Sequence, residues 1–266
     1  QFLTDTARLA DIVLPATTFL EHDDFYTSYG QPYLQLGPKV IEPLGDTRSN
    51  HEVISGLAKR LGADHRAFDM TAWDVIDEIL QTNGFGTADE LKEKRFIEIR
   101  PSFEENHFLN GFPHPDGKFR FKANWAELGP DHAALPDLPD FADIIDETNE
   151  ARPFRMVTAP SRNYLNTSFT ETDTSIEREE RPMILLHPTD CNDLGVIEGD
   201  RVRIGNDRGD LVLHAKPFDG VDRGVAIVEG IWPNLAFEEG IGINLLVSAD
   251  PGKPNGGAVF HDTAIW

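Results

Sequence analysis

Hydrophobic and polar positions follow their clearest pattern between Met183 and Lys216. An apolar run of strand length ends at His187-Pro188, where proline suits the first turn of a helix because its missing N–H would have no partner there. Gly195 then supplies the left-handed conformation that commonly ends a helix. Apolar and charged residues alternate over 201–204, as they do in a half-buried strand. The pattern predicts a strand, a short helix and a second strand.

The residues that follow predict a hairpin and, with it, a closed sheet. Asn206-Asp207-Arg208-Gly209 has the composition of a tight turn, and an apolar run, Leu211 to Leu213, comes after it. Further apolar runs at 154–158 and 224–231, and a last strand over 257–266 with the apolar run 258–260, bring the expectation to about six strands with little helix. Because closing a sheet removes its exposed edges, we expect a small β-barrel with short helices over residues 151–266.

Residues 1–20 combine a helix start with an apolar run. Thr4 and Asp5 are suitable N-cap residues, and the run from Leu9 to Ala16 has the length of a strand and is interrupted by Pro15. A short helix that leads into a buried strand is typical of an α/β unit around a parallel sheet. Ligands of such sheets bind beyond the carboxyl ends of the strands, which here is the loop 15–21.

Helices and then a linker are predicted after this unit. Ser49 and Glu52 form a capping-box pattern ahead of an amphipathic segment that ends at Gly62, and the same device recurs at 71–81 and 87–95. Residues 129–153 are rich in Pro and Asp and lack periodicity, as linkers do. We therefore divide the chain into an α/β fragment with helices (1–128), a linker (129–150) and the barrel (151–266).

Composition limits the classes of function that this chain can have. The 24 Lys and Arg residues against 46 Asp and Glu give a formal charge of −22, which argues against non-specific binding of DNA or RNA. A small anionic ligand held by a few N–H groups and an Arg stays compatible with that charge. No stretch approaches the roughly 20 apolar residues of a membrane span. The one cysteine, Cys191, excludes an internal disulfide and a four-cysteine cluster within these residues, and we expect it in the core.

Few residues suggest chemistry of their own. Glu21-His22-Asp23-Asp24 could be a metal cluster, but adjacent side chains point in different directions, so a solvated loop is the better interpretation. His107 and His114 lack a third ligand nearby. We therefore predict no catalytic residue and no metal ligand in this chain. The strand at 154–158 leads into a polar loop that contains Arg162, a candidate for binding an anion or a polar ligand, although surface loops often have this composition.

Several separated segments together resemble one family. In order and spacing they are similar to the C-terminal part of molybdopterin-dependent oxidoreductases of the dimethyl sulfoxide reductase family. The segments are ADIVLPATTFLE (10–21), VIEPLG and LAKRLG (within 40–62), PDGKFRF (115–121), MVTAPSRNYLNTSF (156–169), HPTDCNDLGVIEGDRVRIGNDRGDLV (187–212), and Trp232, Asn244-Leu245-Leu246 and DPGKP (250–254).

The resemblance implies a fold and a cofactor. The α/β fragment would be the end of the domain that holds one pterin dinucleotide, and the barrel, of the double-psi type, would close over the pterins. Family members carry molybdenum or tungsten between two molybdopterin guanine dinucleotides and transfer two electrons, often with an oxygen atom. Amide and hydroxyl groups would pair with pterin and guanine edges, and Arg162 with pyrophosphate. The implied cofactor-binding residues are Ser161, Arg162, Asn163, Asn166, Ser168, Trp232, Asn244 and Asn255.

The resemblance also implies that other parts of a protein complete the enzyme. The chain opens in mid-pattern, and the metal ligand of the family lies upstream of the matching segments, so we expect a fragment that is inactive alone. Its partners would be the pterin cofactor, upstream domains of the same protein and an electron-transfer partner. We expect a cytoplasmic location, with the periplasm still open. The alternative is a free-standing double-psi barrel that binds a nucleotide or a peptide, but the α/β segment ahead of the barrel favours the oxidoreductase.

Overall fold

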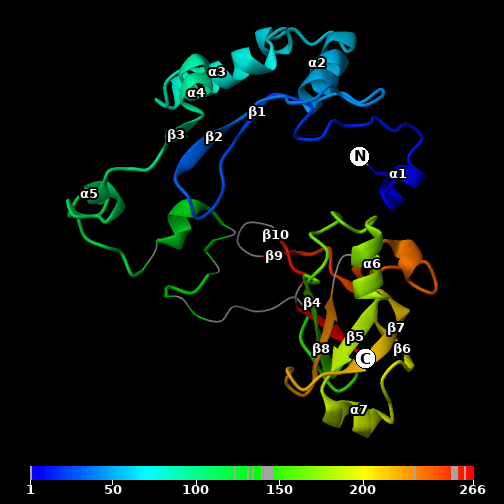
Figure 1. Cartoon of the computed structure of the whole chain (residues 1–266). Helices are drawn as coiled ribbons and strands as arrows, with labels where there is room; N and C mark the ends of the chain where they lie inside the picture. Colours follow the sequence, from blue (N-terminus) through cyan, green and yellow to red (C-terminus); the bar gives the residue numbers. More distant parts are fainter. Residues whose placement is uncertain are drawn as a thin grey trace. The chain divides into compact units, whose positions relative to one another are not determined.

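The computed structural model describes residues 2–122, 124–130, 132–133, 135–138, 140, 146–229, 232–252, 257–260 and 262–266. The chain forms two compact units, Gln1–Phe119 and Arg120–Trp266 (Figure 1). We call them the N-terminal unit and the barrel unit, and each is described by itself.

The N-terminal unit has a small antiparallel sheet packed against two helices. Its strands pair in the order β1-β2-β3. Buried side chains from β2, α3 and α4 form its core, with Leu80 and Leu91 fully enclosed. The elements of the unit are α1 (Asp5–Leu9), β1 (Asp24–Tyr26), β2 (Tyr33–Gly37), α2 (Asn50–Arg60), η1 (Arg66–Phe68), α3 (Ala72–Thr82), α4 (Ala88–Lys94), β3 (Phe96–Glu98) and α5 (Phe103–Asn106).

The helix starts predicted from capping patterns are confirmed. Ser49 and Glu52 form a reciprocal capping box at α2, and Thr71 with Asp74 does the same at α3. Thr87 caps α4 with Glu90. These side chains satisfy backbone N–H groups that have no partner inside the helix, which is why so local a pattern predicts the start of a helix.

The buried strand predicted over Leu9 to Ala16 is wrong. After α1 the chain is extended but pairs only through an isolated parallel bridge between Ala16 and Arg48. Leu9 is 89% exposed and Ile12 78% exposed. A parallel strand needs neighbours that pair with it and cover both its faces, and no described strand does so here. The loop 15–21 is therefore not at the end of a described strand.

Glu21 supports the loop that was expected to be solvated. Its carboxylate accepts hydrogen bonds from the N–H groups of Thr18 (2.6 Å) and Leu44 (2.7 Å), and the side chain is buried. These two bonds hold the pKa of Glu21 below its ordinary value. The residue stabilises the loop as an acceptor of backbone hydrogen bonds.

The barrel unit contains a six-stranded mixed sheet in the order β11-β4-β8-β5-β7-β6. The pairs β4–β8 and β5–β7 are parallel, and the other three pairs are antiparallel. The elements of the unit are η2 (Trp125–Leu128), β4 (Phe154–Ala159), α6 (Asp173–Glu179), β5 (Met183–Leu186), α7 (Pro188–Leu194), β6 (Arg201–Asn206), β7 (Gly209–Pro217), β8 (Val225–Glu229), η3 (Asn234–Ala236), η4 (Ile243–Leu246), β9 (Pro251–Gly252), β10 (Gly257–Ala258) and β11 (Thr263–Ile265).

Backbone hydrogen bonds bring the two edges of this sheet together. The N–H of Trp266, just after β11, donates to the carbonyl of Gly205 in β6 (2.9 Å), and the N–H of Gly205 donates back (3.3 Å). The sheet thus nearly closes into a barrel. The predicted fold class, an α/β fragment followed by a small barrel with short helices, is confirmed. The last strand, predicted over 257–266, is divided: β11 (Thr263–Ile265) completes the six-stranded sheet, whereas β10 (Gly257–Ala258) pairs with β9.

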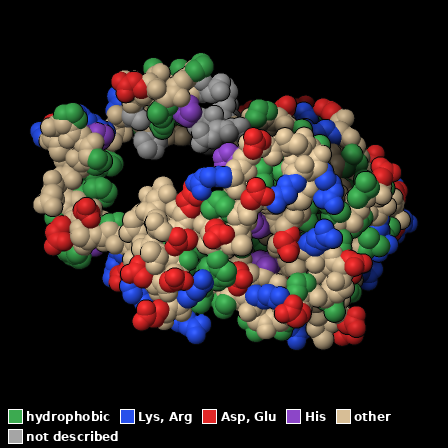
Figure 2. Space-filling model, turned by 90° about the horizontal axis from the view of Figure 1, so that it is seen from above, with side chains coloured by type: hydrophobic (Ala, Val, Ile, Leu, Met, Phe, Trp, Pro, Cys, Tyr) green, Lys and Arg blue, Asp and Glu red, His purple; other side chains and the backbone are tan. Residues whose placement is uncertain are grey.

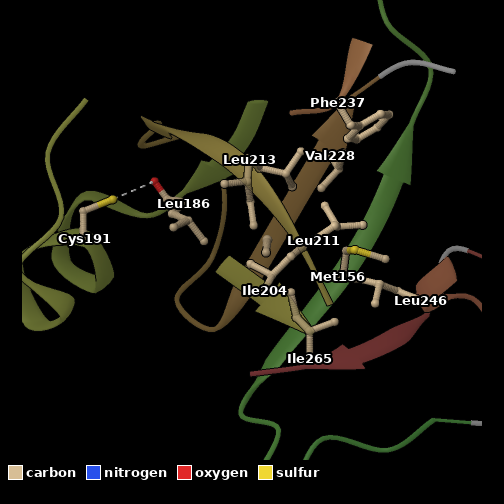
Figure 3. Packing of buried hydrophobic residues seen from close by; sticks show 12 residues of the cluster. Met156, Leu186, Cys191, Ile204, Leu211, Leu213, Val228, Phe237, Leu246 and Ile265 are labelled. Carbon is tan, nitrogen blue, oxygen red and sulfur yellow. Dashed lines mark hydrogen bonds between the residues drawn. The ribbon is translucent and has the colours of Figure 1, made fainter. Parts of the chain in front are cut away.

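Apolar side chains from every strand of the sheet fill the barrel (Figure 3). Met156, Leu213 and Ala226 are fully buried there. Cys191 belongs to the same cluster, and burial raises the pKa of its thiol, as expected for a core residue. Cys191 lies in α7, which begins with Pro188 in its first turn and ends at Gly195 in the left-handed conformation, as predicted.

Charged side chains of both signs alternate over the face drawn in Figure 2. On the barrel, Arg201 pairs with Glu238, and Arg203 pairs with Asp210 and Glu239. These basic side chains of the barrel thus each have an acidic partner. Within the described residues, no helix is both long enough and apolar enough to cross a membrane.

Candidate cofactor-binding site

The polar loop after β4 and the segment after β8 leave the barrel at the same edge. β4 and β8 run parallel, and their last residues, Ala159 and Glu229, are register partners. The carboxyl ends of adjacent parallel strands therefore lie side by side, a position where ligands commonly bind. Tyr164 and Trp232 pack edge to face with ring centroids 5.1 Å apart, so the two segments are in contact.

Ser161 is the buried polar group of this loop. It is 5% exposed, and its Oγ has no hydrogen-bond partner among the described residues. A buried hydroxyl without a partner costs about 1–3 kcal/mol, so such an atom usually meets a ligand or an ordered water. Ser161 therefore marks a place where a polar ligand atom would complete the structure.

Asn163 is held by a residue that the sequence did not single out. Its N–H and its Nδ2 both donate to one carboxylate oxygen of Glu179, the last residue of α6, at 2.7 Å each. The hydrogen-bond network assigns the orientation of the amide, with Oδ1 free to accept from a donor on a ligand. The loop is thus tied to α6, a contact between residues 16 positions apart.

Tyr164 was also missed, and it connects the loop to Trp232. It is buried, and desolvation, with a smaller effect from the charge of Glu179, raises the pKa of its phenol. Trp232 donates from Nε1 to the carbonyl of Glu229 (3.1 Å) and packs against the barrel core. An aromatic residue between polar ones was the available signal, but its partner 68 positions away was not visible in the sequence.

The remaining predicted residues lie on turns. Leu165 and Ser168 exchange two backbone hydrogen bonds (3.1 and 2.9 Å) around a tight turn, where Asn166 has φ +51°, a conformation that Asn tolerates well. Arg162, Asn166 and Ser168 are exposed, so their side chains are accessible to a ligand.

Asn244 belongs to a different segment. It is exposed on η4, and no described contact joins it to residues 161–168. Its neighbour Ile243 packs against the same core as Trp232. The structure thus brings Ser161, Asn163 and Trp232 together through Tyr164 and leaves Asn244 on a separate turn. Asn255 lies outside the described residues.

The chemistry of this loop suits binding. Its side chains offer hydroxyl and amide groups and one guanidinium, which match the amide edges of a fused heterocycle and the oxygens of a pyrophosphate. The orphaned Ser161 hydroxyl fits the same kind of ligand. Among the described residues, no group of three or more His, Cys, Asp and Glu could hold a metal ion. Fold and loop together define a cofactor-binding barrel for a ligand of nucleotide type.

Comparison with known proteins identifies the family. Residues 154–264 match the molydopterin dinucleotide binding domain, and residues 1–60 match the molybdopterin oxidoreductase family. The chain is 32% identical to a probable oxidoreductase, YoaE, of Bacillus subtilis, over 99% of this chain and 38% of the relative. It is 28% identical to the catalytic component of a putative dimethyl sulfoxide reductase of Halobacterium salinarum, over 98% of this chain and 32% of that relative.

A solved structure has the same fold. Acetylene hydratase from Pelobacter acetylenicus superposes with a TM-score of 0.76 at 21% identity, covering 100% of this chain and 38% of that one. The chain belongs to the molybdopterin oxidoreductase family, and residues 154–264 form its molydopterin dinucleotide-binding domain. It spans between about a third and two fifths of the length of these relatives. Because residues 1–60 match as well, the free-standing binding module is not favoured.

Proposed function

We propose that this chain is the C-terminal cofactor-binding part of a molybdenum or tungsten oxidoreductase that carries two molybdopterin guanine dinucleotides. When bound, the cofactor supplies two-electron redox chemistry, often with oxygen-atom transfer. The observation that carries the proposal is the buried, unpartnered hydroxyl of Ser161, at the start of a polar loop in a dinucleotide-binding barrel. The chain contributes binding and orientation, and the proposal assigns it no catalytic residue and no metal ligand.

Each residue of the loop has a role that follows from its chemistry. The Ser161 hydroxyl pairs with a polar atom of the cofactor, and the Asn163 Oδ1, turned away from Glu179, accepts from an N–H of a pterin or guanine edge. The exposed guanidinium of Arg162 neutralises pyrophosphate. Asn166, Ser168, Trp232 and Asn244 would complete the contacts, and Asn255 stays a prediction.

Other expectations also stay predictions. These are the division at 1–128, 129–150 and 151–266, the cytoplasmic location, the upstream domains and the electron-transfer partner. The activity of the whole protein belongs with them, because the chain spans only part of the relatives it matches.

Substitution of Arg162 in the full-length protein tests the assignment. Arg162→Ala removes a charge-assisted bond to phosphate, worth about 1.5–3 kcal/mol, so cofactor affinity should fall roughly 10- to 100-fold. The measurement is the molybdenum or tungsten and pterin content per protein after purification and dialysis. Arg178→Ala, an exposed Arg on α6, is the matched control and should keep its cofactor. Unchanged retention in Arg162→Ala would place the site elsewhere.

The isolated chain provides a second test. The 266 residues alone should retain neither stoichiometric metal nor reductase activity, since the proposal places the metal ligand outside them. Metal analysis and a reductase assay on the purified chain are the measurements. A purified chain that bound the metal and showed reductase activity would contradict the proposal that the metal ligand lies outside these residues.

A further inference from the structure

The carbonyl oxygen of Leu246, at the end of η4, accepts two side-chain hydrogen bonds from the β6–β7 hairpin. Asn206 donates from Nδ2 (2.9 Å) and Arg208 donates from Nε (2.8 Å). A backbone carbonyl has two lone pairs, so both are engaged by side chains that lie about 40 residues earlier in the chain. The tip of the β6–β7 hairpin, for which the sequence predicted only a tight turn, is therefore bonded to η4 through two side chains.

Both the nitrogen and the oxygen of the Asn206 side-chain amide are hydrogen-bonded. It is buried, its Nδ2 also lies 3.4 Å from the carbonyl oxygen of Ala264 in β11, and its Oδ1 accepts from the N–H of Arg208 (3.0 Å). A buried amide with both ends satisfied has one orientation, because a flipped amide would leave donors and acceptors unpaired. Asn206 thus fixes the hairpin tip relative to the closing strand of the barrel.

Arg208 also bonds a third segment, the residues that precede β4. Its two terminal nitrogens bond the two carboxylate oxygens of Asp146, which is 9% exposed. A two-point pair between Arg and a shielded carboxylate has a specific geometry that a Lys cannot reproduce. One guanidinium therefore ties η4 to the chain that precedes β4.

Packing reinforces these bonds. A Cβ on Gly209, the residue after Arg208, would lie 2.6 Å from Cδ2 of Leu245. A larger residue at position 209 would have to displace the Leu245 side chain, so the hairpin and η4 are in close contact. The segment η4 itself is a single 3₁₀ turn, closed by hydrogen bonds from Leu245 N–H to Gly242 (3.1 Å) and from Val247 N–H to Asn244 (3.3 Å). So short a turn does not hold its own shape. Its order comes from the burial of Leu246 and Ile243 against the barrel core and from the two hydrogen bonds of the hairpin.

From these contacts we propose that Asn206 and Arg208 are positioning residues for the cofactor. They touch no ligand themselves. By fixing the Leu246 carbonyl they hold η4 in one conformation and present the exposed Asn244, two residues earlier, to the pterin dinucleotide. The proposal rests on the proposed function, in which Asn244 is a cofactor contact.

The test compares variants of the hairpin in the full-length protein. Arg208→Gln should speed amide hydrogen exchange of Leu245 and Val247 at least tenfold and lower the pterin content several-fold. Arg208→Lys offers one nitrogen in place of three and should fall between Arg208→Gln and wild type. Asp207→Asn is the matched control, because Asp207 lies in the same turn, is exposed and pairs with Arg152 rather than η4. It should behave as wild type in both measurements.

Asn244→Ala separates the two proposals. It should lower the pterin content while the exchange of Leu245 stays slow, since the hairpin contacts are intact. Two results would overturn the positioning role. One is a loss of pterin in Asn244→Ala together with a normal pterin content in Arg208→Gln. The other is an unchanged rate of amide hydrogen exchange in η4 of Arg208→Gln. If Asn244→Ala keeps its pterin while Arg162→Ala loses it, Asn244 is not a contact and the positioning proposal fails with it, whereas the proposed function stands. Should Arg208→Gln fail to fold, Arg208→Lys takes its place.

Discussion

The two units of this chain use their apolar residues differently. In the barrel, strands from residue 154 to residue 265 enclose a common core, and Gly205 and Trp266 close the sheet. In the N-terminal unit, α2 buries none of its residues, and Leu61 after it is 85% exposed. The apolar run from Leu9 to Leu14 is exposed as well.

The difference shows what each architecture needs. A closed sheet pairs its own edges, so one continuous stretch of chain supplies both the strands and their neighbours. A strand of a parallel sheet must be paired and covered on both faces, and the described residues supply neither for Leu9 to Ala16. The barrel thus pairs its own strands around a common core, whereas the N-terminal unit leaves the apolar run from Leu9 to Leu14 and much of the apolar side of α2 uncovered within the described residues.

The largest expected effect is the loss of stability when one buried leucine is shortened in the core of either unit. Leu213→Ala in the barrel and Leu80→Ala in the N-terminal unit each delete a fully buried side chain. Such changes cost about 2–5 kcal/mol, and Leu213 should lie near the upper end because a closed barrel cannot collapse around the cavity.

Urea denaturation with tryptophan fluorescence measures both effects. Trp73 is the tryptophan of the N-terminal unit, so a Trp73→Phe background reports the barrel unit alone. Leu213→Ala should shift the barrel transition, and Leu80→Ala should leave it in place. If both substitutions shifted the barrel transition equally, the two units would unfold as one. The barrel core would then not be independent of the N-terminal core.

A smaller effect depends on pH and concerns the barrel alone. Burial opposes ionisation of Asp190, but hydrogen bonds from the Gly224 N–H (2.8 Å) and the guanidinium of Arg223 outweigh it, so the pKa of the carboxyl is below its ordinary value. A group with a lowered folded pKa stabilises the fold fully above its unfolded pKa, near 4, and this contribution is lost as the pH falls through the folded pKa.

Asp190→Asn should therefore lower barrel stability by about 1.5–3 kcal/mol at pH 7, the range for a hydrogen bond to a charged group. The difference from wild type should shrink as the pH falls below about 4. Thermal unfolding at pH 3 to 7 is the measurement, and Asp193→Asn, an exposed partner of the same Arg223, is the control. A difference that stayed constant over this range would show that the Asp190 charge does not contribute.

Local signals allowed the correct part of the sequence-based prediction. The capping box of Ser49, Pro188 in the first turn of α7 and the left-handed Gly195 each act within a few residues, so they can be recognised without the fold. The barrel strands were predicted because alternation also lies within one strand.

Interactions between distant residues account for what was missed. Leu9 to Ala16 has the composition of a strand, but a strand exists only where a neighbour pairs with it. The Tyr164–Trp232 contact and the bonds from Arg208 to Leu246 join residues 38 or more positions apart. Glu179 lies in a charged segment, and only the fold brings it to Asn163. The polar loop could thus be proposed as a site from the sequence, where it stays a prediction, but the residues that hold the loop in place could not be found.

The smallest expected change in stability tests the exposed apolar surface directly. Leu61→Lys in the 266-residue chain should alter the free energy of unfolding by less than about 0.5 kcal/mol, because the side chain is exposed and Lys is favourable at a helix C-terminus. It should nevertheless weaken self-association in sedimentation velocity. The added positive charge reduces the net repulsion of a chain with charge −22, so weaker association could only come from the lost apolar surface. Leu194→Lys, an exposed position on the barrel, adds the same charge and should leave association unchanged. A stability loss above about 1 kcal/mol in Leu61→Lys would mean that this side chain is covered in solution, and the contrast between the apolar surfaces of the two units would not hold at this position.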